Sequence, residues 1–222
     1  MGIHTAWDLS QVTDSFARKH LTVVGLRTVK ELRGEPCIDL EDIPPAKQNI
    51  CTSRSFGETL TALTDIEEAL ATHTVRCAMK LRKQKSCAGV ITVFLMMNRF
   101  KESHYYYSRT IKLDSPSNSE LVLLHHAIKA LKQMYRPGMQ YKKTGIIVSD
   151  LVPVGQVQLS LLSSHNLERD TKLMHTLDEL REKFGNKFVK YGVQGTGKKW
   201  MLKEEHISAC YTTDVKKVLR VG

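Results

Sequence analysis

The chain has 222 residues, of which 41% are hydrophobic and 25% are charged, and its formal net charge is +10. This length allows one large domain or two small ones, since a domain usually takes roughly 100–200 residues. The composition excludes a wholly disordered chain, because the apolar residues recur periodically and there are only 13 glycines and six prolines.

The sequence predicts no membrane span and no targeting segment. Its longest apolar stretch, residues 88–97, is about half as long as a spanning helix requires and contains Thr92. The first ten residues lack the basic and apolar regions of a signal peptide. We therefore expect a cytoplasmic protein.

The cysteines and histidines predict no metal site. The five cysteines are odd in number and widely spaced, and no C-x-x-C pair is present, which is typical of reduced thiols rather than a disulfide framework or a zinc ribbon. His125 and His126 are adjacent, so on a helix they point about 100° apart and do not form a chelating pair.

The N-terminal part is predicted to be helical and to end in a linker. Residues 3–33 read as two helical pieces, with Thr5 as the cap of the first and Gly34 as the stop of the second. Residues 34–46 contain three prolines and four acidic residues and show little periodicity, which indicates a linker.

The next hundred residues alternate between strands and helices. Strands are predicted at residues 48–54, 88–98, 105–113 and 145–154. Capping boxes, Thr64 to Glu67 and Ser117 to Glu120, predict the starts of two helices, and a turn is expected at residues 114–116. The first helix has an apolar stripe of Ile66, Leu70, Cys77, Ala78 and Leu81.

This order predicts an α+β, ferredoxin-like domain of the β-α-β-β-α-β type. Its four-stranded sheet has two helices on one face and leaves the other face open. After residue 163, an amphipathic helix is predicted from Leu173, Leu177, Leu180 and Phe184. A hairpin of residues 188–193 and 200–202 follows it, which together make a small C-terminal α+β domain.

The positive charge is concentrated beside this open face. Residues 76–143 hold 14 Lys and Arg residues but only three acidic ones, and such an excess attracts polyanions, although a solvated basic surface is the alternative. Alternation along residues 105–113 groups the hydrogen-bond donors Tyr106, Ser108, Thr110 and Lys112 on one side. Tyr105, Tyr107, Arg109, Ile111 and Leu113 take the other side, and a register error of one residue would exchange the two sets.

Three segments resemble a known family. Residues 1–9 (MGIHTAWDL), 27–58 (RTVKELRGEPCIDLEDIPPAKQNICTSRSFGE) and 198–214 (KKWMLKEEHISACYTTD) are similar to the C-terminal half of UmuC-type polymerases. These are the catalytic subunits of DNA polymerase V and its plasmid-borne relatives, within the Y-family of translesion DNA polymerases. The resemblance covers almost the whole chain.

The resemblance implies a division of the chain by region. Residues 1–33 correspond to the end of the thumb, 34–46 to the tether and 47–155 to the little finger. Residues 156–163 correspond to a clamp-binding peptide, and residues 164–222 to the short C-terminal domain of this branch. The little finger of the family grips backbone phosphates along the duplex.

The resemblance also implies binding residues and partners. The residues expected to contact DNA phosphates are Lys47, Ser53, Arg54, Ser55, Arg109 and Lys112. The segment Gln158, Leu159, Ser160, Leu161 and Leu162 is similar to the peptide that binds the sliding clamp, although Leu162 stands where the family more often has Phe. The other implied partners are damaged primer-template DNA, a UmuD-like dimer and the RecA filament.

Catalysis is expected to lie outside this chain. In the family, palm carboxylates hold two magnesium ions, and the palm and fingers would precede Met1, so the chain alone is not expected to polymerise DNA or to bind a cofactor. The alternative function is an interaction module without a direct DNA role. An RNA-binding domain would use the aromatic residues at 105–107, but no RNP1 motif accompanies them.

Overall fold

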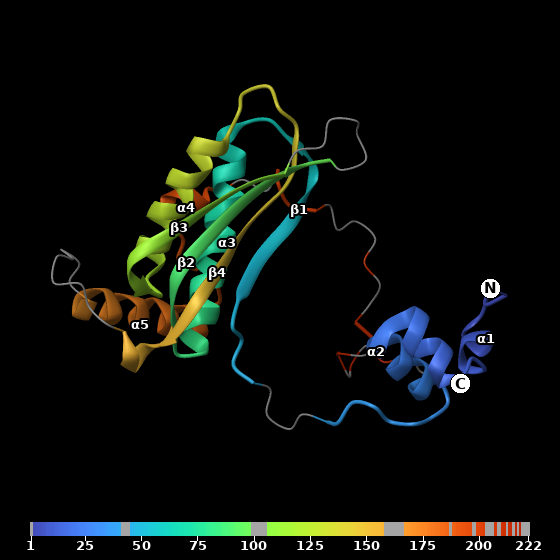
Figure 1. The fold of residues 1–222 in the computed structure, drawn as a ribbon. Coiled ribbons are helices and arrows are strands. Elements are labelled where there is room, and N and C mark those ends of the chain that lie inside the picture. The colour runs from blue at the N-terminus through green and yellow to red at the C-terminus, as the bar shows by residue number, and fades with distance from the viewer. Residues whose placement is uncertain are drawn as a thin grey trace. The chain divides into compact units, whose positions relative to one another are not determined.

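The computed structural model divides the chain into two compact units, Met1–Ala46 and Lys47–Gly222 (Figure 1). The structure describes residues 2–40, 45–98, 106–157, 167–186, 188–196 and 199–202, with residues 207, 210, 211, 213, 214, 216 and 218. The two units are described one at a time.

The first unit contains two helices, α1 (Ala6–Ser10) and α2 (Asp14–Leu32). Thr5 caps α1 as predicted, because its hydroxyl accepts a hydrogen bond from the Asp8 N–H at 3.1 Å. Arg33, directly after α2, holds the pair together: it forms an ion pair with Asp14 at 2.7 Å and donates to the Ser10 carbonyl at 2.8 Å. The prediction of helical structure over residues 3–33 is therefore confirmed, but α2 is broken by a kink at Thr22, whose backbone angles are not helical.

The second unit is built on a four-stranded antiparallel sheet. Its strands are β1 (Ile50–Leu60), β2 (Ser86–Met97), β3 (Tyr106–Ser117) and β4 (Tyr141–Pro153), in the order β1-β4-β2-β3. β1 and β2 both run antiparallel to β4, which lies between them, so α3 (Leu63–Lys83) crosses over between two parallel strands. In the same way α4 (Glu120–Met134) joins β3 to β4 across β2.

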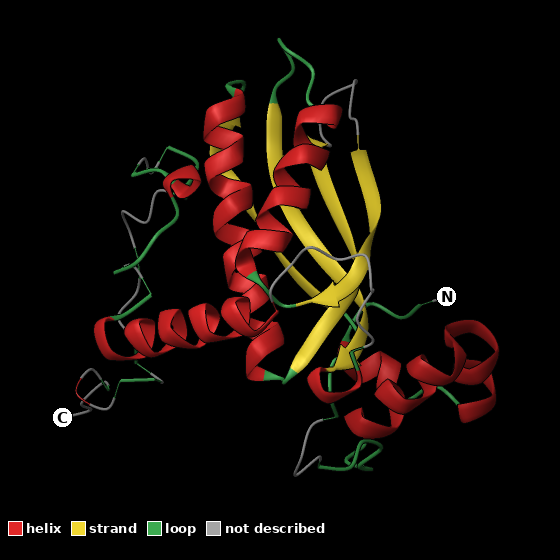
Figure 2. Ribbon diagram, turned by 90° about the vertical axis from the view of Figure 1, so that its left-hand side faces the viewer, coloured by secondary structure: helices red, strands yellow, loops and turns green. Residues whose placement is uncertain are grey.

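Both crossover helices cover the same face of the sheet (Figure 2). The predicted stripe of α3, from Ile66 to Leu81, is fully buried there against the alternate residues Ile91, Val93 and Leu95 of β2. Among the described residues of the second unit, no helix lies over the other face. This confirms the predicted α+β fold with two helices on one face.

The structure corrects several boundaries. β1 extends to Leu60, because Phe56 and Leu60 are also buried in the core. β3 continues to Ser117, which pairs with Ala88, so the turn predicted at residues 114–116 is wrong. Both predicted capping boxes are wrong as well, since α3 and α4 begin at Leu63 and Glu120 without a side-chain cap.

The C-terminal part packs on α3 and α4 in an unexpected way. The predicted amphipathic helix is present as α5 (Leu167–Phe184), but Leu173 and Phe184 of its apolar stripe are 41% and 51% exposed. The helix instead buries Met174 and Arg181. The predicted hairpin is wrong: the described residues of 188–202 form one 3₁₀ turn, Gly192–Gln194, and no strand.

Within the described part of the chain, no helix combines the length and the apolar character needed to cross a membrane.

Candidate nucleic-acid interface

The strand register shows which residues lie on the face of the sheet opposite the helices, called the open face below. Residues paired between neighbouring strands point to the same side of a sheet. On the open face, three rows of paired residues cross all four strands. In the sheet order β1, β4, β2, β3, the rows are Cys51, Ile147, Thr92, Thr110; Ser53, Gly145, Phe94, Ser108; and Ser55, Lys143, Met96, Tyr106. Lys112, paired with Val90, continues the β3 column.

The open face is rich in groups that can bind an anion. Ser53, Ser55, Ser108, Thr110 and Tyr106 supply hydroxyl groups, and the Thr92 and Thr110 hydroxyls are hydrogen bonded at 2.9 Å. Lys112 and Lys143 supply positive charge. The four central strand segments, residues 51–55, 90–96, 106–112 and 143–149, contain no acidic residue. The hydroxyl and ammonium groups of these segments can donate hydrogen bonds to phosphate oxygens.

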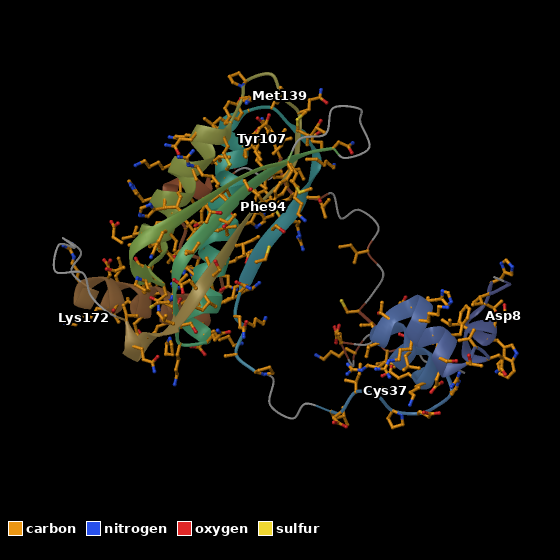
Figure 3. All side chains as sticks on the ribbon, in the orientation of Figure 1. Asp8, Cys37, Phe94, Tyr107, Met139 and Lys172 are labelled. Carbon is orange, nitrogen blue, oxygen red and sulfur yellow. The ribbon has the colours of Figure 1, made fainter. Side chains whose placement is uncertain are left out.

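An aromatic pair occupies the centre of this face. Phe94 (labelled in Figure 3) is only 5% exposed, although it points away from the helical core. The ring of Tyr106 stacks beside it, with the ring centroids 5.9 Å apart and the planes at 25°. The Lys143 ammonium lies 6.0 Å from the Phe94 centroid on the β4 side. Tyr106 and Lys143 thus flank a buried Phe94 ring.

Gly145 makes room for this arrangement. A Cβ at this position would lie 2.7 Å from the Phe94 Cζ and 2.3 Å from the Ser53 Cβ. These distances are too short for any real side chain. The glycine therefore leaves the space beside β4 that the Phe94 ring and the Ser53 side chain occupy.

The structure brings some of the predicted DNA-contacting residues together and separates others. Ser53, Ser55 and Lys112 lie on the open face. Arg54 pairs with the buried Thr144, and Arg109 pairs with the buried Val93, so both point to the helix-covered side of the two edge strands. The two arginines therefore do not share a face with Lys112, as the predicted alternation of residues 105–113 already required for Arg109.

Lys47 lies just before β1 and is hydrogen bonded to Gln84, the residue directly after α3. Its N–H donates to the Gln84 side-chain oxygen at 3.1 Å, and the Gln84 amide donates to the Lys47 carbonyl at 2.9 Å. This pair of hydrogen bonds fixes the backbone of Lys47, while the residue itself is exposed.

Sequence reasoning missed Lys143 and Phe94. The predicted strand began at Gly145, two residues after Lys143, whereas β4 begins at Tyr141. Extending the alternation by two residues would have placed Lys143 on the same side as Gly145. Phe94 carried no such signal, because β2 is almost continuously apolar and its two faces look alike in sequence.

A buried ion cluster attaches α5 to the helical side. Glu120, at the start of α4, is fully buried and accepts hydrogen bonds from Arg82 of α3 at 2.6 Å and from the Arg181 Nη2 of α5 at 2.9 Å. Arg82 also forms a bidentate pair with Asp178 of α5, both distances being 2.6 Å. Burial alone would lower the pKa of Arg82, but the bonds to Asp178 and Glu120 outweigh it and raise the pKa.

A second contact joins the C-terminal segment to the edge strand β1. The Gly57 N–H donates to the Trp200 carbonyl at 3.3 Å, and the Trp200 ring packs edge-on against His73 of α3 with centroids 5.7 Å apart. Neither nitrogen of His73 has a hydrogen-bond partner in the described structure. Burial, followed by the charges of Arg76, Arg54 and Lys143, lowers the pKa of His73 to about 4.

Two other predictions concern the clamp peptide and metals. Residues 158–162 lie outside the described residues, so the clamp-binding role of Gln158 to Leu162 stays a prediction. Among the side chains that the structure describes, no three His, Cys, Asp or Glu residues are grouped so as to hold a metal ion.

The four-stranded sheet with two helices on one face defines an α+β domain, and comparison with known proteins gives its family. The profile of the impB/mucB/samB family C-terminal domain matches residues 47–161, which is more than half of the chain. The chain belongs to this family. Residues 171–221 match a second profile, described as a domain of unknown function (DUF4113).

Individual relatives agree with this assignment. The chain is 38% identical to protein UmuC of Salmonella typhimurium strain LT2 over 225 residues, an alignment that covers 100% of the chain and 53% of UmuC. It is 38% identical to protein ImpB of Salmonella typhimurium over 216 residues, covering 96% and 51%. Protein MucB of Escherichia coli is 34% identical over 221 residues, covering 98% and 52%. The chain thus spans about half the length of these relatives and corresponds to the C-terminal half of UmuC.

Proposed function

We propose that the chain is the DNA-holding, clamp-docking C-terminal part of a UmuC-like error-prone translesion polymerase that acts in the cytoplasm in SOS repair and mutagenesis. The observation that supports this role is the open face, where hydroxyl groups and two lysines lie on strand segments without an acidic residue. Contacts of this kind bind the DNA backbone and do not depend on the base sequence, which suits an enzyme that must accept any template.

The phosphate-binding role of the open face is tested by replacing its two lysines. For the variant Lys112→Ala plus Lys143→Ala, we expect weaker duplex binding and a log K against log[salt] slope that is smaller by about two, because each lost phosphate contact removes about 0.9 from the slope. Fluorescence anisotropy with a labelled duplex, at salt concentrations from about 50 to about 200 mM, measures both the affinity and the salt slope.

The matched control removes two lysines from the helices on the opposite side. Lys80→Ala plus Lys129→Ala gives the same change of net charge on exposed positions of α3 and α4. We expect this control to keep most of the salt slope. Duplex binding that does not change with salt, or that falls equally in both double variants, would contradict phosphate binding by the open face.

We also propose that this chain, by itself, does not polymerise DNA. In the family, chemistry requires palm carboxylates that hold magnesium, and this chain aligns with the C-terminal half of UmuC. The purified 222-residue protein should therefore give no primer extension with a primed template, magnesium and all four deoxynucleotides. Extension above that of a buffer control, retained after a second purification step, would refute this proposal.

The proposed partners are a sliding clamp, bound through Gln158 to Leu162, a UmuD-like dimer and the RecA filament. A second candidate function is an interaction module with no direct DNA role. The exposed Leu173 and Phe184 on α5 favour it, because such an apolar stripe can dock a partner protein. Clamp capture that survives Arg109→Ala plus Lys112→Ala but not Gln158→Ala, together with no DNA binding, would select this candidate.

A further inference from the structure

The Tyr106 ring is a feature that phosphate binding does not explain. Tyr106 is 56% exposed at the edge strand β3, whereas the Phe94 ring against which it stacks is 5% exposed. An exposed tyrosine on a sheet surface commonly has more than one staggered χ1 rotamer open to it. Here the stacking contact holds one ring face of Tyr106 against Phe94 and leaves the exposed area elsewhere on the ring. The aromatic surface is therefore held in place before any ligand binds.

The neighbours of Tyr106 give this surface a definite chemistry. Lys143 is one of its row-mates across β2, and Lys112, Thr110 and Ser108 follow it along β3 on the same face. A held aromatic ring beside cations and hydroxyl groups is the combination with which proteins bind a single nucleic-acid strand, because the bases stack and the phosphates meet the cations. Duplex bases already stack on each other and offer no free face to a side chain.

We propose that Tyr106 is a stacking site for an unpaired base, so that the open face holds single-stranded DNA as well as the duplex backbone. This inference rests on the proposed function, since it requires the open face to bind DNA. Phe94 is the positioning residue: it supports the Tyr106 ring and does not itself touch the base. The ligand is a template segment that has no partner strand, and its base is recognised by its π-face and not by its identity.

The test compares single-stranded and duplex DNA on the same protein. With the full 222-residue chain and a labelled dT oligonucleotide, Tyr106→Ala should weaken single-strand binding by about tenfold, within the range measured for the loss of one base–aromatic stack. Tyr106→Phe should restore it, because the ring and not the hydroxyl makes the contact. Duplex affinity should change less than about twofold in both variants.

Two controls separate stacking from other causes. Phe188→Ala removes an exposed aromatic residue that stacks on Phe184 after α5, with centroids 4.7 Å apart, and should leave single-strand binding unchanged. An oligonucleotide of abasic sites has phosphates but no bases, and the ratio of wild-type to Tyr106→Ala affinity should fall to about one on it. An equal loss on the abasic and the dT strand would overturn the stacking proposal.

A second measurement keeps the proposal testable if Tyr106→Ala does not fold. In Tyr106→Trp, the new indole should be quenched by dT oligonucleotide, beyond any change seen for Trp7 and Trp200 in the wild-type chain. No added quenching at saturating oligonucleotide would overturn the proposal. If duplex binding is normal but Tyr106 has no effect, only this inference fails; if neither DNA form binds, the proposed function fails with it.

Discussion

Replacing Glu120 with Gln should lower the free energy of unfolding of the second unit by about 3–5 kcal/mol, the range for removal of one partner from a buried ion pair. Glu120 is fully buried and Arg181 is 3% exposed, so the glutamine would leave the Arg181 charge in the interior facing Arg82. Urea unfolding at pH 7.5, followed by circular dichroism, measures the change.

Two further variants identify the cause of that loss. Asp178→Asn removes an acidic partner of Arg82 whose side chain is 37% exposed, and we expect only about 1 kcal/mol, since solvent screens this pair. Glu120→Leu combined with Arg181→Met removes a buried charge of each sign and should recover much of the stability lost in Glu120→Gln. A loss below about 1 kcal/mol in Glu120→Gln would contradict the buried-charge explanation.

The fold was predictable because its signals are local and periodic. The α3 stripe from Ile66 to Leu81 and the order of the four strand segments specify a two-layer domain without any knowledge of contacts. The capping box at Ser117 to Glu120 failed because a distant residue decides the role of Glu120: Arg181, 61 positions away, takes both carboxylate oxygens. No window of the sequence around Glu120 contains that partner.

Residues distant in sequence also decide which side of α5 packs against the domain. Its leucines have the spacing of a buried stripe, yet the helix docks through Arg181, Asp178 and Met174, because these side chains match the charges and space that α3 and α4 offer. For the candidate interface, alternation correctly grouped Tyr106, Ser108, Thr110 and Lys112. The alternation pattern could not predict the Phe94–Tyr106 stack, which depends on the register between two strands and on the space above Gly145.

The stability of the second unit should fall as the pH is lowered from about 6.5 to about 4, and His73 should cause a large part of that fall. Burial is the first cause that lowers its pKa to about 4, from the 6.5 of an unperturbed histidine. Between these two pH values the unfolded chain binds a proton at His73 and the folded chain does not, so protonation favours unfolding. The contribution is fully present above pH 6.5, and about 3 kcal/mol is lost when the pH reaches 4.

The variant His73→Leu isolates this contribution, because carboxylates that titrate over the same range are common to both proteins. The difference in unfolding free energy between variant and wild type should shift by about 3 kcal/mol in favour of the variant between pH 7.5 and pH 4. His125→Leu removes an exposed histidine of α4 and is the matched control, which should follow the wild type at each pH. A constant difference between His73→Leu and wild type across the range would mean that His73 binds its proton at the same pH in the folded and the unfolded chain, and that burial does not lower its pKa.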